Sequence, residues 1–299
     1  MVKIKVAIVG YGNIGRFSLE AVEASPDMEC VGVVRRSGSA DGFPELAPYK
    51  VVSDIGELGK VDVAILAVPS RKVRENAEKY LSMGISTVDS FDIHTDICAL
   101  RAALAPVAEK NGAVSVISAG WDPGSDSVVR ALMQGLAPRG ISYTNFGPGR
   151  SMGHSVAARA VEGVKDALSV TIPIGTGLHR RMVYVELEQG ADADKVAAAI
   201  KADPYFAHDE THVLPVDSID AYNDMGHGVN LVRKGVSGNT HNQLLEFNMK
   251  INNPALTGQV LVMVSRASVR QRPGCYTMIE IPVVDYLAGD RETLIRQLV

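Results

Sequence analysis

Three glycines near the start of the chain have the spacing of a dinucleotide-binding turn. They occur in Gly10-Tyr11-Gly12-Asn13-Ile14-Gly15, which follows the apolar run 6–9 and precedes an amphipathic segment at 16–24. A strand, a tight turn and a helix in this order present the helix N-terminus to a pyrophosphate. The motif is short, and a glycine turn without a ligand is the alternative. The flanking strand and helix favour the dinucleotide site.

The residues after the second predicted strand indicate which nicotinamide cofactor binds. Units specific for NAD place an acid there, about 20 residues after the glycines, to bind the ribose 2′-hydroxyl. Here the strand 30–34 is followed by Arg35-Arg36-Ser37, with no acid. Two guanidinium groups suit a 2′-phosphate, so the sequence predicts NADP rather than NAD. Two solvated arginines in a surface loop are the alternative.

Two acids stand just beyond other predicted strands. Asp92 ends the run Val88-Asp89-Ser90-Phe91-Asp92, and Asp122 lies in Ala119-Gly120-Trp121-Asp122-Pro123-Gly124. Ligands bind beyond the carboxyl ends of parallel strands, so both acids are expected near the nicotinamide. Two carboxylates there suit a substrate with an ammonium group, and either could accept its proton. Each acid could instead be only a helix cap or a turn former.

The elements that position these residues alternate between strands and helices. Predicted strands lie at 51–52, 61–68, 85–88 and 113–117, and predicted helices at 71–83 and 95–110. This alternation predicts an α/β fold with a Rossmann-type doubly wound parallel sheet.

From about residue 120 the strands become longer and the helices fewer. Strands are predicted at 141–146, 168–174, 181–188, 211–216, 229–235 and 243–251, and helices at 127–136, 154–164 and 193–202. This pattern favours an antiparallel or mixed sheet with helices on one face, in an α+β second domain. A further apolar helix at 254–269 should pack back on the first domain. The expected domains are therefore 1–120, with a return at about 254–299, and 121–253.

Composition excludes several classes of protein. The 299 residues are 46% hydrophobic and 21% charged, with a formal net charge of −4 that gives no basic footprint for nucleic acid. No apolar run approaches the ~20 residues of a membrane span. The cysteines Cys30, Cys98 and Cys275 are widely spaced, and the histidines show no metal-binding spacing. We therefore expect a cytoplasmic protein without a metal ion.

Longer stretches resemble one family, the meso-diaminopimelate dehydrogenases. The resemblance rests on VAIVGYGNIG, VVRR, VDSFDIH, SAGWDPG, FGPGRSMGHS, HGVNL and FNMKINNPALT, which together span nearly the whole chain. The glycine motifs are generic, whereas WDPG followed by MGHS is specific to the family. The resemblance implies reversible, NADP-dependent oxidative deamination of the D-centre of meso-diaminopimelate, in lysine biosynthesis. The products would be L-2-amino-6-oxopimelate (tetrahydrodipicolinate) and ammonia, and the enzyme a homodimer formed through its second domain, which would also bind the substrate.

The resemblance also assigns residues to the substrate. Asp92 and Asp122 would lie near the D-centre amino group, and either would be the catalytic proton acceptor. The residues themselves do not choose between Arg181 and the adjacent Arg180, because neighbours on a strand face opposite sides. The full substrate-binding set implied is Asp92, Asp122, Phe146, Met152, Gly153, Thr171, Arg181, His227 and Asn253. The last four would hold the carboxylates and the L-centre.

The predicted cofactor-binding residues come from the loops that follow the first-domain strands. They are Gly10, Tyr11, Gly12, Asn13, Ile14, Gly15, Arg35, Arg36, Ser37, Val68, Pro69, Ser70, Ser90, Phe91, Asp92, Trp121, Asp122, Pro123 and Gly124.

Two other functions remain open from the sequence. One is another NADP-dependent two-domain enzyme, a sugar dehydrogenase or a dihydrodipicolinate reductase. The paired-histidine signature of that reductase is missing, and a sugar dehydrogenase would usually have a lysine where this chain has Trp121-Asp122-Pro123. The other is a non-catalytic NADP-binding sensor, which would have no reason to keep Asp92, Asp122 and Arg181.

Overall fold

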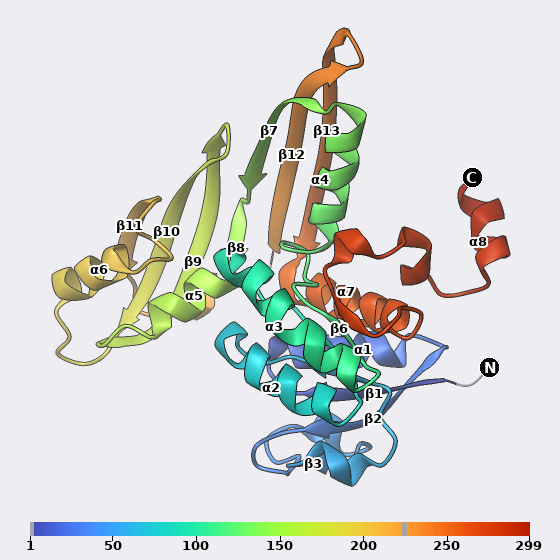
Figure 1. The fold of residues 1–299 in the computed structure, drawn as a ribbon. Coiled ribbons are helices and arrows are strands. Elements are labelled where there is room, and N and C mark those ends of the chain that lie inside the picture. Colours follow the sequence, from blue (N-terminus) through green and yellow to red (C-terminus); the bar gives the residue numbers. More distant parts are fainter. Residues whose placement is uncertain (1–2, 223–225) are drawn as a thin grey trace. The chain divides into compact units, whose positions relative to one another are not determined.

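The chain divides into two compact units. The structure, a computed structural model, describes residues 3–222 and 226–299. Unit 1 consists of Met1–Val128 and Pro254–Val299, and unit 2 of Val129–Asn253 (Figure 1). The first segment of unit 1 thus ends at Val128, where the sequence pattern suggested residue 120. The chain passes between the units inside one helix and at the start of another.

Unit 1 is built on a parallel sheet of seven strands within the described residues. Their spatial order is β14-β6-β5-β4-β1-β2-β3, and every neighbouring pair is parallel. The strands are β1 (Ile4–Val9), β2 (Met28–Val34), β3 (Val51–Val52), β4 (Val63–Leu66), β5 (Ser86–Asp89), β6 (Val114–Val116) and β14 (Gly274–Tyr276). The predicted Rossmann-type sheet is therefore confirmed.

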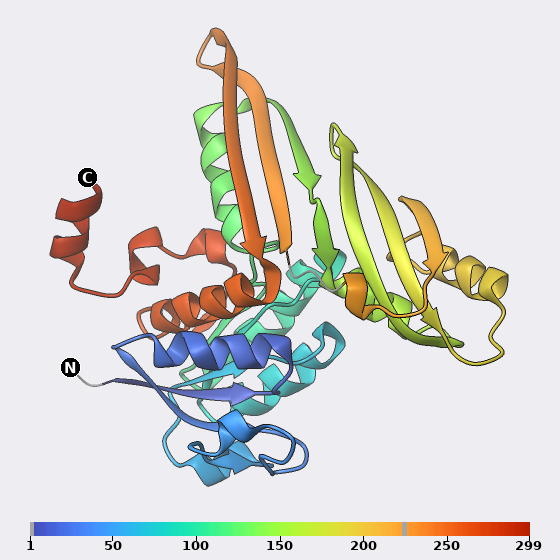
Figure 2. The same ribbon diagram turned by 180° about the vertical axis from the view of Figure 1, so that it is seen from behind.

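Helices cover both faces of this sheet. Val6 and Ile8 of β1 pack in one apolar cluster with α1 (Asn13–Glu23) and α7 (Asn253–Ser268). Ala7 and Val9 pack in a second cluster with α2 (Ser70–Ser82) and α3 (Ile97–Lys110). Successive side chains of a strand point to opposite faces, so β1 contributes to both cores. The two views of the ribbon show these helix pairs on opposite sides of the sheet (Figures 1 and 2). The helix α7 belongs to unit 1 and packs in the first of these clusters.

The C-terminal segment of unit 1 differs from the prediction. The sequence pattern predicted no element after residue 269, whereas β14 adds an edge strand beside β6 and α8 (Arg291–Leu298) ends the chain.

Short 3-10 turns occur in both units, at Pro44–Leu46, Ile55–Leu58, His94–Asp96, Asp220–Tyr222, Met278–Glu280 and Val283–Tyr286. None of the helices formed by the described residues combines the length and apolar character needed to cross a bilayer.

Unit 2 has two sheets where the sequence suggested one. A mixed sheet runs β11-β10-β9-β8, in which β11 is parallel to β10, and an antiparallel sheet runs β13-β12-β7. Strands are β7 (Arg139–Phe146), β8 (Gly149–Ser151), β9 (Val164–Gly175), β10 (Leu178–Leu187), β11 (Glu210–Pro215), β12 (Gly226–Ser237) and β13 (Thr240–Asn252). Helices are α5 (Met152–Arg159) and α6 (Ala193–Ala202), with the C-terminal part of α4 (Ser125–Leu136). The predicted helix 154–164 was wrong at its end, because α5 stops at Arg159 and Val164 begins β9.

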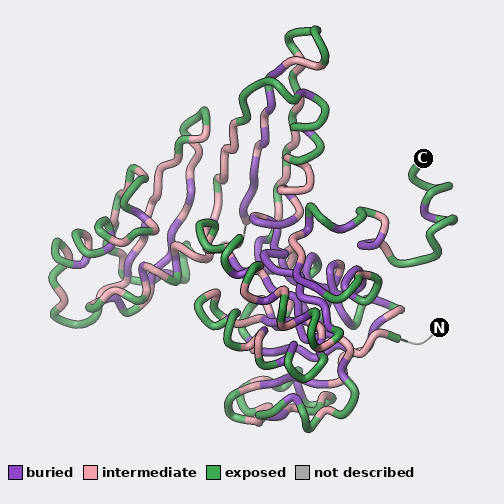
Figure 3. Tube along the Cα trace, in the orientation of Figure 1, coloured by how far each residue is buried: buried purple, intermediate pink, exposed green. Residues whose placement is uncertain are grey.

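The two sheets of unit 2 differ in how their side chains are buried. The four-stranded sheet packs on α5 and α6 around buried residues that include Val183, Ile200 and Phe206. In the three-stranded sheet, the odd-numbered residues of β12 from His227 to Gly235 are buried. The even-numbered residues of β13 from Thr240 to Asn252 are exposed, which gives the alternating colours along that strand (Figure 3). One face of this sheet is therefore open.

Candidate active site

The glycine turn between β1 and α1 forms an open cradle. Gly10 has a φ of +89°, and a Cβ there would lie 2.4 Å from the Ala67 carbonyl oxygen. A Cβ at Gly15 would lie 2.2 Å from the Gly10 carbonyl oxygen. At Gly12, the N-cap of α1, a Cβ would meet nothing within 4 Å. Packing therefore requires two of the glycines, whereas the third leaves the helix N-terminus open to a phosphate.

The two arginines after β2 have different environments. The Arg35 guanidinium stacks on Phe43, 4.3 Å from the ring centroid, and donates to the carbonyl oxygens of Ser39 and Asp41. Arg36 is exposed and, within residues 3–222 and 226–299, makes no hydrogen bond or ion pair. Arg35 thus organises its own loop, and Arg36 is the guanidinium that can meet an anion.

Asp92 is held by the first residue of α2. The Ser70 hydroxyl donates to Asp92 Oδ1 at 2.6 Å, which joins the loop after β4 to the loop after β5. Ser70 and Asp92 were both predicted to bind the cofactor, and this hydrogen bond brings the two residues together. Asp92 keeps its second carboxylate oxygen outside this hydrogen bond.

Asp89 joins the loops that carry the two predicted acids. Its Oδ1 accepts hydrogen bonds from the amides of Phe91 at 2.9 Å and Ser118 at 3.1 Å. Its carbonyl oxygen accepts from the Ala119 amide at 2.7 Å. Complete burial raises the pKa of Asp89 to about 7, because an apolar environment disfavours the carboxylate. Asp89 was not among the predicted site residues, although it belongs to the same run as Asp92.

Asp122 lies in a tight turn before α4. The Gly120 amide donates to the Pro123 carbonyl oxygen at 3.0 Å, and a Cβ at Gly124 would lie 1.9 Å from the Gly120 carbonyl oxygen. Because α4 begins at Ser125, Asp122 is outside the helix and is not its N-cap. A cavity of about 140 Å³ is lined by Ile97, Ser118, Pro123, Gly124, Ser127, Thr277, Met278 and Ile279. Two predicted cofactor residues, Pro123 and Gly124, thus line a cavity.

Thr171 and Arg181 of unit 2 are cross-strand partners. They face each other in the register of β9 and β10, and Arg181 Nη1 donates to Thr171 Oγ1. Arg181 Nε donates to Asp209 Oδ2 at 2.6 Å, and the Arg181 side chain is only 11% exposed. Arg180 instead pairs with Glu210 at 2.8 Å and is 41% exposed. The structure therefore distinguishes the two arginines that the sequence could not.

A glycine-rich segment joins this pair to His227. Gly149 of β8 pairs with Thr171, and a Cβ at Gly149 would lie 2.2 Å from the Gly226 carbonyl oxygen and 2.6 Å from the His227 Cα. The Gly147 amide donates to the Gly228 carbonyl oxygen at 2.7 Å. The backbones of the two sheets of unit 2 thus meet at this segment. Gly149 lies between Thr171 of β9 and His227 of β12. Asn253 joins the same region through its side-chain amide, which lies 3.4 Å from the Arg150 carbonyl oxygen.

Two further histidines surround the predicted unit 2 residues. His179 Nε2 accepts a hydrogen bond from the Phe146 amide at 2.8 Å. His154 lies in α5, which begins at Met152 and Gly153, and its Nδ1 is 2.7 Å from the Ser151 hydroxyl. Burial, with the nearby Arg181 charge second, lowers the pKa of His154 to about 4. Both effects disfavour an imidazolium, so His154 is neutral near pH 7.

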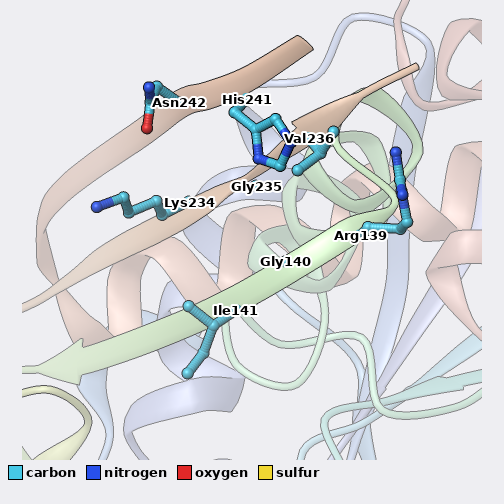
Figure 4. Close-up of a pocket in the computed structure, with 8 residues that line it drawn as sticks. All are labelled: Arg139, Gly140, Ile141, Lys234, Gly235, Val236, His241 and Asn242. Carbon is cyan, nitrogen blue, oxygen red and sulfur yellow. The ribbon is translucent and has the colours of Figure 1, made fainter. Parts of the chain in front are cut away.

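A groove in unit 2 lies away from these residues. It has a volume of about 400 Å³ and is lined by Arg139, Gly140, Ile141, Lys234, Gly235, Val236, His241 and Asn242, as Figure 4 shows. These residues belong to β7, β12 and the β12–β13 hairpin, and none is a predicted site residue. The groove is therefore separate from the Thr171–Arg181 pair.

Asp209 and His154 were not predicted as site residues. Asp209 is 28 residues from Arg181 in the sequence, in a segment without any motif. His154 belongs to the MGHS segment, and that segment is the sequence signal that points to it. The pairing of β10 with β11 and the packing of α5 bring both residues to Arg181.

The fold and these loops define a nucleotide-binding oxidoreductase with a separate second unit. The profile of the oxidoreductase family with an NAD-binding Rossmann fold matches residues 4–92, and that of the diaminopimelic acid dehydrogenase C-terminal domain matches residues 120–180 and 175–253. A meso-diaminopimelate D-dehydrogenase from Bacteroides fragilis is 64% identical over 299 residues, which is 100% of both chains. The chain belongs to the meso-diaminopimelate D-dehydrogenase family.

Solved structures agree with this assignment. Diaminopimelate dehydrogenase of Corynebacterium glutamicum in complex with diaminopimelate has a TM-score of 0.91 and 29% identity, with 100% of both chains covered. An engineered D-amino acid dehydrogenase bound to NADP+ has a TM-score of 0.88 and 29% identity over the same coverage. The predicted resemblance and fold class are confirmed.

Proposed function

We propose that this protein catalyses the reversible, NADP-dependent oxidative deamination of the D-centre of meso-diaminopimelate. The products are L-2-amino-6-oxopimelate, which cyclises to tetrahydrodipicolinate, and ammonia. The observation that carries the proposal is the 64% identity, over the full length of both chains, to a meso-diaminopimelate D-dehydrogenase. The cytoplasmic location expected from the sequence stays a prediction.

The loops of unit 1 support NADP as the cofactor. Gly12 leaves the N-terminus of α1 open for the pyrophosphate, and no acid follows β2 to bind a ribose 2′-hydroxyl. Arg36 is exposed beside Ser37, where a 2′-phosphate would lie. We assign the 2′-phosphate chiefly to Arg36, because Arg35 is already engaged with Phe43 and with loop carbonyl oxygens.

The carboxylates of unit 1 suit the reacting amine. The nicotinamide supplies the hydride acceptor. Asp92 and Asp122 recognise the ammonium group, and one of them takes its proton, because the amine must be neutral before its carbon loses hydride. The resulting imine is hydrolysed by water to the ketone and ammonia. The Ser70 hydroxyl orients Asp92 through the 2.6 Å hydrogen bond.

Residues of unit 2 suit the distant end of the substrate. Arg181 is a planar cation that can bind a carboxylate with two parallel hydrogen bonds, and Thr171 fixes its orientation. His227 and Asn253 add donors nearby. We assign Phe146, Met152 and Gly153 to the lining of the same substrate region. Binding both ends of a nearly symmetric substrate would decide which of its two centres reacts.

The open face of the three-stranded sheet supports a homodimer. Lys234 of β12 pairs with Leu244 of β13 and with Ile141 of β7. Leu244 and Ile141 are both exposed, so two apolar side chains flank the exposed Lys234 on this face. We propose that this face contacts a second copy of the chain. Leu244→Glu should then give monomers in light scattering after gel filtration, whereas Leu178→Glu, an exposed change on the other sheet, should leave dimers.

The proposed reaction is tested by following NADPH formation at alkaline pH. The substrates are meso-diaminopimelate, its L,L isomer, D-alanine and glucose, and NAD⁺ is the cofactor control. We expect turnover with the meso isomer and NADP⁺, and none with the L,L isomer or glucose. Turnover of glucose would indicate a sugar dehydrogenase. Tight NADPH binding without turnover of any substrate would indicate a sensor.

A further inference from the structure

The guanidinium of Arg181 is held on two sides inside unit 2. Nε donates to Asp209 Oδ2 at 2.6 Å, and Nη1 donates to Thr171 Oγ1. The side chains of Arg181 and Asp209 are 11% and 23% exposed. A charge-assisted hydrogen bond at this depth is screened little by water, so the pair fixes the rotamer of Arg181.

These two contacts decide which edge of Arg181 can bind a ligand. A guanidinium has five N–H donors in one plane, one of them on Nε. Asp209 takes the Nε donor and Thr171 takes one on Nη1. The contact with Asp209 closes the edge that includes Nε, so a carboxylate meets the donors that remain on Nη2 and Nη1.

The main chain around Asp209 is itself anchored. The Asp209 amide donates to the Phe206 carbonyl oxygen at 3.1 Å, and Phe206 is fully buried in the core of the four-stranded sheet. The Thr211 hydroxyl donates to the Asp209 carbonyl oxygen at 3.2 Å. The carboxylate therefore projects from a rigid turn before β11, and it can impose its position on Arg181.

The neighbouring ion pair provides an internal comparison. Arg180 and Glu210 pair across the same two strands at 2.8 Å, but their side chains are 41% and 45% exposed. Exposed pairs contribute little, because water screens both charges. The two ion pairs use residues that are adjacent in the sequence, and they differ in burial and in the contact of Arg181 with Thr171.

We propose that Asp209 is a positioning residue that fixes the carboxylate-binding edge of Arg181. Asp209 thereby sets the preference for a D-amino acid with a second, distal carboxylate over one without it. The inference rests on the proposed function, because the ligand of Arg181 is the L-centre carboxylate of meso-diaminopimelate. Without Asp209 the guanidinium would remain cationic but would lose the fixed orientation of that edge.

The test compares Asp209→Asn with Glu210→Gln on two substrates. D-lysine is meso-diaminopimelate without the L-centre carboxylate, so it keeps the reacting D-centre and lacks the group that Arg181 binds. We expect Asp209→Asn to lower kcat/KM for meso-diaminopimelate about 10- to 100-fold, mainly through KM. The same variant should change kcat/KM for D-lysine less than about twofold, and Glu210→Gln should leave both substrates within about twofold. If D-lysine reacts too slowly, its inhibition constant against meso-diaminopimelate replaces its kcat/KM.

Further measurements separate positioning from damage to the fold. On an Arg181→Met background, Asp209→Asn should have little additional effect on meso-diaminopimelate, because Asp209 acts through Arg181. The thermal midpoint of each variant reports folding. The inference would be overturned, and the proposed function left standing, if Asp209→Asn lowered kcat/KM equally for both substrates. An unchanged or lower KM of this variant for meso-diaminopimelate would have the same meaning. An unmodified protein that is inactive on meso-diaminopimelate would overturn the proposed function and this inference with it.

Discussion

The two acids of unit 1 differ in what surrounds them. Asp92 accepts a hydrogen bond from Ser70, whereas Asp122 lies in the turn that closes between Gly120 and Gly124. Asp92→Asn and Asp122→Asn each remove one possible proton acceptor without changing size. We expect the true acceptor's variant to lose about 10²- to 10⁴-fold in kcat.

The pH profile identifies which acid is the acceptor. A general base must be ionised, so its replacement should remove the acidic limb of the kcat/KM profile. The other variant should keep that limb with a lower rate. Steady-state rates of NADPH formation from pH 5 to 10 make the comparison. Wild-type kcat in both variants would refute a proton-accepting role for either acid.

Arg35 and Arg36 give a second prediction at single residues. Arg36→Ala should raise the KM for NADP⁺ about 10- to 100-fold, because a charge-assisted contact with phosphate is lost. The KM for NAD⁺ should change little. Arg35→Ala should lower the free energy of unfolding by about 0.5–1 kcal/mol through loss of the Phe43 stack. Equal effects of Arg36→Ala on NADP⁺ and NAD⁺ would contradict the assignment of the 2′-phosphate.

Residue types and motifs could indicate a candidate site residue only where it lies directly after a predicted strand or close in sequence to the residues that it contacts. The glycine turn, Arg36 and Asp92 follow predicted strands, so the edge on which they lie could be deduced. Asp209 could not be found in this way, because its contact with Arg181 depends on how β11 pairs with β10. His154 depends in the same way on the packing of α5 beside β9 and β10.

At the scale of elements, α1 and α7 approach each other closely in unit 1. A Cβ at Gly258 of α7 would lie 2.7 Å from the Phe17 carbonyl carbon and 2.8 Å from the Ser18 nitrogen, both backbone atoms of α1. Gly258→Ala should therefore force the helices apart and lower the free energy of unfolding by about 1–3 kcal/mol. Urea denaturation measures the change.

A matched substitution separates packing from helix propensity. Gly135→Ala in α4 would place a Cβ where nothing lies within 4 Å. Alanine is the better helix former by up to about 1 kcal/mol, so this variant should be neutral or more stable. Destabilisation of both variants by the same amount would show that the close approach of α1 and α7 is not the cause.

Most helices and strands were predicted from the regular spacing of their apolar residues. The others are short or depend on partners far away in the sequence, so no pattern predicted them. The long strands β10 and β13 were predicted because they alternate over many residues. The edge strand β14 has only three residues and exists because β6 offers it a partner. The division of unit 2 into two sheets was missed, because strand patterns do not reveal which strands pair.

At the scale of the whole molecule, each unit contains a buried group with a strongly shifted pKa. In unit 2 the pKa of His154 is lowered to about 4, so the unfolded chain binds the proton first as the pH falls below its ordinary pKa of 6.5. Protonation of the unfolded state removes stability as the pH falls from 6.5 towards 4. Lowering the pH from 7 to 5 should cost unit 2 about 2 kcal/mol.

Asp89 gives unit 1 the opposite dependence. Its pKa is raised from 3.8 to about 7, so the unfolded chain releases the proton first as the pH rises. The stability from this group is complete below pH 3.8 and is lost as the pH rises through 7. Raising the pH from 5 to 7 should cost unit 1 about 2 kcal/mol.

The two dependences should be visible as opposite shifts of the urea midpoints of the two units between pH 7 and pH 5. Trp121 is the one tryptophan of the sequence and lies in unit 1, so its fluorescence follows that unit, whereas far-UV circular dichroism follows both. From pH 7 to pH 5 the urea concentration at the midpoint of the fluorescence change, which reports unit 1, should rise. The part of the dichroism change that fluorescence does not follow reports unit 2, and its midpoint should fall to a lower urea concentration. Asp89→Asn should remove the first shift and His154→Gln the second, because neither replacement titrates in this range. Shifts of unchanged size in both variants would show that other groups govern the response of this molecule to pH.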